Sequence, residues 1–184
     1  MKLRLHAFVL VALSSVAALP VHAEEEESLL LSGFEEPIID QWRSNNDKYP
    51  PFVSELDPEK VKEGTSSGKW EAGPQSNPWL FFKETPADWS GYEGMSFWLY
   101  SENGNGQQLN ITVNSGEGYY LHRVNVDWQG WNHVVIPFSE FSAPRKVAGW
   151  NDVSGLMFSL KGYGQEEPLP DTLLYFDDLR LIRR

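Results

Sequence analysis

The sequence has no cysteine, which excludes a disulfide framework, thiol chemistry and a lipid-attachment cysteine. Basic residues are also scarce: 15 lysines and arginines stand against 26 aspartates and glutamates, and the formal net charge is −11. Nucleic acid and acidic polysaccharide both need a basic footprint on a protein, so this sign argues against them as non-specific partners. A local basic patch is not excluded.

A long hydrophobic run is missing too. The apolar stretch from Ala7 to Ala18 is shorter than the ~20 residues that a membrane span needs. It follows Lys2 and Arg4 and precedes Val21-His22-Ala23, an order typical of a secretory signal peptide cleaved after Ala23. A membrane-anchored helix is the alternative. We therefore expect a secreted or periplasmic protein without membrane insertion, with a signal peptide at residues 1–23 and an acidic disordered start at residues 24–28.

No helix of normal length can be placed on the chain. Prolines and glycines recur about every ten residues, which is the spacing of strands in a sandwich. Short alternating or apolar segments lie between them, from Leu29 to the end of the chain. The pattern predicts an all-β protein, with residues 29–184 forming a single antiparallel β-sandwich domain.

The stretch from Trp89 to Val113 organises this prediction, because it contains a turn, a strand, a polar hairpin loop and a second strand. Apolar and polar residues alternate with a period of two in both strands, as in half-buried antiparallel strands. The displayed face carries an indole, a phenol, amides and hydroxyls rather than mainly charges. Such a surface favours a ligand, and a sugar fits it best. Its residues are Trp98, Tyr100, Asn110 and Thr112.

The next alternating segment, residues 118–126, adds to this face. If Val124 and Val126 point to the core, then Tyr119, Arg123 and Asn125 point outward. Lys161 extends a later strand in the same way. Arg123 is the first candidate for ligand contact, because a guanidinium can fork onto two hydroxyls or a sugar carboxylate. A simple cross-strand charge partner is the alternative role for it.

Catalytic patterns are weak. A glycosidase needs two carboxylates facing one cleft, and the strands of the displayed face carry no convincing acidic pair. Tyr119, His122 and Arg123 resemble the base and neutralising groups of a lyase, but alternation turns His122 toward the core. His122 and His133 are the histidines left after cleavage, and no HxH or HExxH spacing exists. We expect a non-catalytic protein, with a polysaccharide lyase or hydrolase as a less favoured reading.

The order of several short segments resembles the carbohydrate-binding modules of the galactose-binding-like jelly-roll type, and family 11 and its relatives most closely. The segments are GFEE, EGTSSGKW, DWSGYEGMSFWLY, GWNHVVIPFSEF, GLMFSL and YFDDLRL. The resemblance implies a jelly roll that binds a polysaccharide or oligosaccharide. A galactose-binding-like domain that serves in protein interaction or assembly is the other possibility.

The resemblance also implies a structural calcium ion held by Glu35 and Asp177, with Glu36 and Asp178 as alternatives. Backbone carbonyls near Ser32 and within residues 62–64 would complete the oxygen ligands that Ca²⁺ prefers. Solvated charges at strand ends are the alternative reading of these acids.

In modules of this type a sugar lies across the concave sheet face, where rings stack on it and polar groups bond to its hydroxyls. Trp79 and Tyr92 are candidates for the rim. Four tryptophans beside turns are expected to be structural: Trp89, Trp128, Trp131 and Trp150. The expected sugar-binding residues are Trp98, Tyr100, Asn110, Thr112, Tyr119, Arg123, Asn125 and Lys161.

Overall fold

The computed structural model describes residues 28–45, 51–71, 79–161 and 167–183, and the statements below concern these residues. The predicted signal peptide lies outside the described residues, as does most of the predicted acidic start. Both stay predictions.

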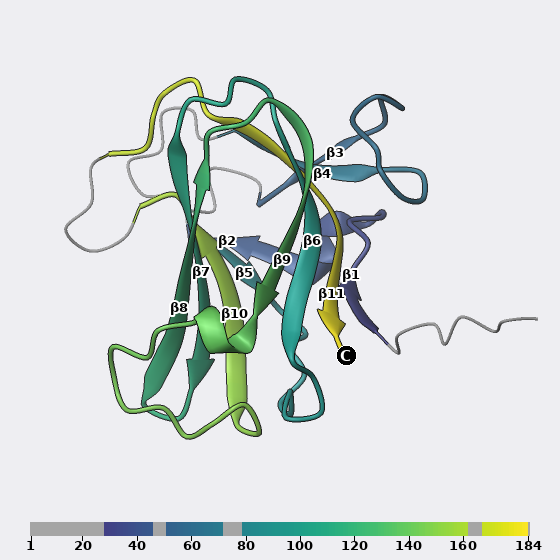
Figure 1. Ribbon diagram of the computed structural model, residues 1–184. Coiled ribbons are helices and arrows are strands. Elements are labelled where there is room, and N and C mark those ends of the chain that lie inside the picture. The colour runs from purple at the N-terminus through teal and green to yellow at the C-terminus, as the bar shows by residue number, and fades with distance from the viewer. Residues whose placement is uncertain (1–27, 46–50, 72–78, 162–166, 184) are drawn as a thin grey trace, which may run out of the picture.

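Two antiparallel sheets face each other, which confirms the predicted β-sandwich (Figure 1). The six-stranded sheet has the order β3-β4-β11-β6-β9, and β1 also pairs with β11. Its strands are β1 (Leu29–Ser32), β3 (Val53–Glu55), β4 (Ser67–Glu71), β6 (Gly94–Ser101), β9 (Gly130–Pro137) and β11 (Leu173–Ile182). The five-stranded sheet has the order β2-β5-β10-β7-β8. Its strands are β2 (Trp42–Ser44), β5 (Trp79–Phe82), β7 (Gln107–Ser115), β8 (Gly118–Val126) and β10 (Val153–Ser159).

Helical structure in the described residues is limited to two short turns, α1 (Ile38–Gln41) and η1 (Phe138–Glu140). Within the same residues, no helix has the length and apolar character needed to cross a membrane. Arg43 and Ser44 lie in β2 and pair with β5. Trp42 begins this strand, and its buried ring fixes the strand against the core.

The predicted hairpin between residues 94 and 113 is also wrong. β6 pairs with β9 and β11, whereas β7 pairs with β8 and β10. The polar connection at residues 102–106 therefore crosses from one sheet to the other. Alternation within each strand was predicted correctly, but the outward faces of β6 and β7 belong to opposite sides of the sandwich.

The core between the sheets is rich in aromatic rings. Phe34, Trp42, Phe158 and Phe176 are all fully buried, and the Trp42 ring lies 5.6 Å from Phe34 and 5.5 Å from Phe158 between ring centroids. The Trp42 Nε1 donates a hydrogen bond of 3.2 Å to Ser32 Oγ, so this buried indole keeps a polar partner. Burial of such large rings supplies much of the hydrophobic stabilisation of the fold.

A second group of rings closes one end of the sandwich. Trp150 lies between Tyr120 and Phe138, with a centroid distance of 3.9 Å to each. Trp89 is fully buried and nearly parallel to Phe138 at 6.0 Å. These contacts give Trp89 and Trp150 the structural role that was expected of them.

Candidate functional site

The outward face of the five-stranded sheet brings polar, aromatic and cationic side chains into rows that cross the strands. Register places one row in direct succession, one residue from each of four neighbouring strands: Trp79, Ser159, Asn110 and Arg123. A parallel row crosses all five strands: Arg43, Phe81, Met157, Thr112 and Leu121. Side chains opposite one another on one face of a sheet are in contact distance, so each row is a continuous surface.

The middle of this face is buried. Asn110 and Ser159 point outward, yet each is only 2% exposed, and Thr112 and Met157 are 7% exposed. Arg43 and Arg123, on the two outermost strands, are exposed. Four inter-strand steps separate these strands, a span of about 19 Å. The face therefore has a buried, mainly polar middle between two exposed arginines.

Hydrogen bonds orient the polar end of the face. Arg123 Nε donates to Asn110 Oδ1 at 3.3 Å, and Asn110 Nδ2 donates to the Ser159 carbonyl at 3.3 Å. Asn125 Nδ2 donates to Asp127 Oδ2 at 3.2 Å. Because Asn110 is buried and bonded on both sides, it holds the Arg123 guanidinium in place.

Tyr119 and Lys161 lie at the edges of the same face. The Arg145 guanidinium is 5.9 Å from the Tyr119 ring centroid, and Lys161 forms an ion pair with Glu167. The structure thus brings together six of the eight expected sugar-binding residues: Asn110, Thr112, Tyr119, Arg123, Asn125 and Lys161.

The aromatic end of the face was missed by sequence reasoning, apart from Trp79. Trp79 and Phe81 have ring centroids 6.2 Å apart, and the Arg43 guanidinium lies 4.5 Å over the Phe81 ring. The segment WLFFK is apolar on both faces, so alternation does not reveal that Phe81 points outward. Arg43 was missed because β2 is only three residues long and gives no alternating pattern in the sequence.

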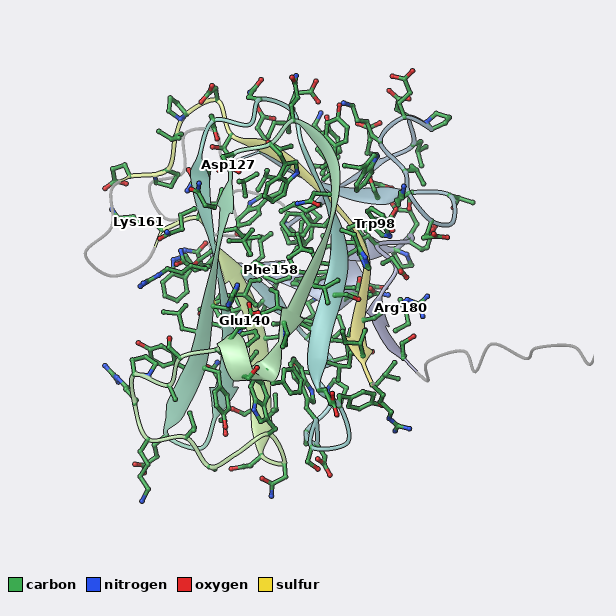
Figure 2. All side chains as sticks on the ribbon, in the orientation of Figure 1. Trp98, Asp127, Glu140, Phe158, Lys161 and Arg180 are labelled. Atoms are coloured by element: carbon green, nitrogen blue, oxygen red, sulfur yellow. The ribbon has the colours of Figure 1, made fainter. Side chains whose placement is uncertain are left out.

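Trp98 and Tyr100 do not join this face, and the expectation that they do is wrong. Both project from β6 on the outward face of the six-stranded sheet. There the Trp98 ring stacks on the His133 ring with 4.5 Å between centroids, and the Tyr100 ring contacts the Trp131 ring edge-on at a centroid distance of 5.4 Å. Lys62 Nζ lies 4.1 Å over the Trp98 ring. Figure 2 shows Trp98 on one side of the molecule and Lys161 and Asp127 on the other.

Tyr92 also lies away from the candidate face. It contacts Arg183, whose guanidinium is 4.9 Å from the ring, and lines a cavity of about 480 Å³ together with Phe138 and Trp150.

The grouping needed for a lyase is not formed. His122 lies opposite Ile111, a core residue, whereas Tyr119 and Arg123 lie opposite Asn114 and Asn110 on the outward face. The side chains of His122 and Arg123 therefore leave β8 on opposite sides.

Glu35 and Asp177 both bind the loop that precedes β4. Glu35 accepts hydrogen bonds from the Thr65 amide at 2.8 Å and the Thr65 hydroxyl at 2.6 Å. Asp177 Oδ2 accepts the amides of Lys62 at 2.8 Å and Glu63 at 3.0 Å. Gly64 links the two contacts: its φ is +67°, and a Cβ at this position would collide with Glu35 Oε1.

The other oxygen of Asp177 has no hydrogen-bond partner within the described residues, although the side chain is fully buried. Burial raises the pKa of Asp177 to about 6, against the lowering effect of the Glu63 and Lys62 amides. An unpartnered buried carboxylate oxygen is costly unless a cation or proton meets it.

The two alternative acids have other roles. Glu36 accepts the Ile38 amide at 3.3 Å, and Asp178 receives Arg180 Nε at 2.7 Å. The described residues contain no group of three or more His, Cys, Asp or Glu side chains that could hold a metal. A cation at Asp177 would therefore need backbone carbonyls among its ligands.

The sequence matches the family described as "Carbohydrate binding domain (family 11)" over residues 32–147. The structure is similar to the family 11 carbohydrate-binding module of the cellulosomal cellulase Lic26A-Cel5E of Clostridium thermocellum, with a TM-score of 0.61, 14% identity, and coverage of 85% of this chain and 95% of that chain. The Clostridium thermocellum family 11 module in complex with a β-1,3-1,4-mixed-linked tetrasaccharide gives a TM-score of 0.61 at 15% identity, with the same coverage.

TmCBM61 in complex with β-1,4-galactotriose is a further similar structure, with a TM-score of 0.52, 19% identity, and coverage of 83% of this chain and 94% of that chain. No curated protein matches the sequence significantly. The structural likenesses show the fold, and the sequence match extends over more than half of the chain. Together they confirm the resemblance predicted from the sequence.

Proposed function

The chain belongs to the family 11 carbohydrate-binding domains, and we propose that it binds a polysaccharide, without catalysis, on the outward face of the five-stranded sheet. The observation that carries this proposal is the cross-strand row of Trp79, Ser159, Asn110 and Arg123. It sets a ring, a hydroxyl, an amide and a guanidinium side by side on one face of the sheet.

This row has the chemistry that a glycan requires. A half-exposed indole offers an apolar face for the C–H side of a sugar ring, and the exposed guanidinium, which the buried Asn110 amide holds in place, can bond to hydroxyl groups. Because the strands hold these groups in fixed register, little ordering is needed when a ligand binds. The signal-peptide pattern at the amino terminus supports a function outside the cytoplasm. Amino-terminal sequencing of the exported protein tests this, and we expect Glu24 as its first residue.

Arg123→Ala tests the site. We expect this variant to lose about 2 kcal/mol of binding free energy, or about thirtyfold in affinity, because it removes the exposed polar anchor at one end of the row. The measurement is affinity electrophoresis of the wild type and the variant through gels that contain a panel of soluble polysaccharides.

Trp98→Ala is the matched control, since it removes a ring from the opposite sheet. It should migrate like the wild type in every gel. If the polysaccharide slows the migration of Arg123→Ala but not that of Trp98→Ala, the glycan site lies on the six-stranded sheet instead. If no polysaccharide retards the wild type, an interaction or assembly role becomes the better account.

We also propose that a calcium ion binds at Asp177 and Glu35. The unpartnered Asp177 oxygen supports this proposal, because a cation would supply the contact that the buried carboxylate lacks. Both acids already bind the same loop, so the ion would tie β11 to the segment that precedes β4 and stabilise the fold. The ion would stabilise the fold and would not contact the sugar, because β11 belongs to the six-stranded sheet and the proposed binding face lies on the five-stranded sheet.

A further inference from the structure

The acidic residues of this protein are unevenly distributed. The formal net charge is −11, yet none of the strands β2, β5, β7, β8 and β10 contains an aspartate or glutamate. The described outward face of these strands instead carries Arg43 and Arg123. The six-stranded sheet differs, since Glu55, Glu71 and Asp177 lie in its strands.

Two acids at the rim of the five-stranded sheet have partners. Asp127 accepts the Asn125 amide at 3.2 Å, and Glu167 pairs with Lys161. Arg145, which lies over Tyr119, adds another cation at the edge. The strand positions of this face therefore carry two exposed arginines and no acid, on a protein whose net charge is negative. Charges elsewhere on the surface are largely screened beyond about 10 Å at moderate salt.

This charge pattern separates two kinds of glycan. Sugar hydroxyls donate as well as accept hydrogen bonds, whereas carboxylate and sulfate groups only accept them. An arginine offers five donors and no acceptor, in a fork that matches two oxygens of one anionic group. Arg123 is held through Nε by Asn110, and no contact to its terminal nitrogens is recorded among the described residues. The oriented guanidinium is suited to an anion.

We propose that this face binds an anionic polysaccharide, with Arg43 and Arg123 contacting carboxylate or sulfate groups on separate sugar units. The inference rests on the proposed glycan-binding function and narrows its substrate class. The two arginines lie on the outermost strands of one sheet, and these strands are about 19 Å apart. This spacing favours a polymer that carries charge repeatedly along its length over a single charged sugar.

Calorimetric titration of the full protein with matched pairs of polymers tests this inference. Polygalacturonate and alginate are each compared with their carboxyl-reduced forms, and carrageenan with its desulfated form, so that charge changes while the backbone linkages stay. We expect at least one anionic polymer to bind tenfold or more tightly than its neutral counterpart, with affinity falling as salt rises. Whether the carboxylated or the sulfated polymers bind identifies the anionic group.

Arg43→Gln and Arg123→Gln should each weaken that binding at least tenfold, whereas Lys69→Gln, which removes the same charge from the opposite sheet, should not. Equal affinity for charged and neutral partners overturns this inference but leaves the glycan-binding function in place. Absence of binding to every polymer, charged or neutral, overturns both.

Discussion

Chelation of calcium is expected to lower the melting temperature of the protein by about 5 to 10 °C, because an ion at Asp177 stabilises only the folded state. A ligand present at a hundred times its dissociation constant contributes about 2.7 kcal/mol, and each kcal/mol shifts the melting temperature of a protein of this size by about 2 to 4 °C. The measurement is thermal unfolding with excess calcium and with chelator.

Asp177→Asn should abolish this calcium effect. Asp178→Asn is the matched control, because Asp178 is the next residue but receives Arg180 rather than facing the loop. Its melting temperature should still respond to calcium. Equal melting temperatures of the wild type in calcium and in chelator would show that hydrogen bonds from the loop hold Glu35 and Asp177 without an ion.

The pH dependence of stability provides a second test in chelator. The pKa of Asp177 is raised from 3.8 to about 6 in the folded protein, so its contribution to stability is fully present below about pH 4 and is lost as the pH rises through 6. Relative to Asp177→Asn, the wild type should lose about 2 kcal/mol between pH 4 and pH 6, out of a total of about 3 kcal/mol over the whole titration. Calcium should remove most of this loss, because the ion compensates the ionised carboxylate.

Alternation in the sequence predicted which side of each strand faces the core, but not which sheet each strand joins. Phe97 and Ile111 are both buried as predicted. Yet Trp98 and Asn110 lie on opposite sides of the sandwich, because the chain crosses between the sheets at residues 102–106. Hydrophobic alternation is a property of one strand, whereas sheet membership depends on long-range pairing. Arg123 and Asn110, on the directly paired strands β7 and β8, were therefore placed together correctly.

Local backbone irregularity limited the prediction of the acidic pair. Side-chain alternation along β11 could not show which of Asp177 and Asp178 faces the loop. The register of this strand shifts between Asp177 and Arg180, and Asp178 has a φ of +49°. Asp177 is buried behind the loop as a result, while Asp178 pairs with Arg180. Such a bulge leaves no clear signal in alternating hydrophobicity.

Trp42→Ala is expected to destabilise the protein by about 4 kcal/mol and to lower its melting temperature by about 10 °C, because it removes a buried indole from between the sheets. The Trp42 ring is fully buried, and its centroid lies 5.1 Å from the ring centroids of both Phe52 and Phe82. Chemical denaturation of the wild type and the variant measures the loss, and Trp42→Phe should recover part of it.

The same substitution links the core to the candidate face. Trp42 anchors β2, and the next residue, Arg43, points outward over Phe81. Trp42→Ala should therefore weaken glycan binding as well, even at temperatures where the protein stays folded. Trp79→Ala is the matched comparison, because this half-buried ring points outward from β5. It should weaken binding with little loss of stability, and an equal loss of stability in both variants would place Trp79 among the core rings instead of on the binding face.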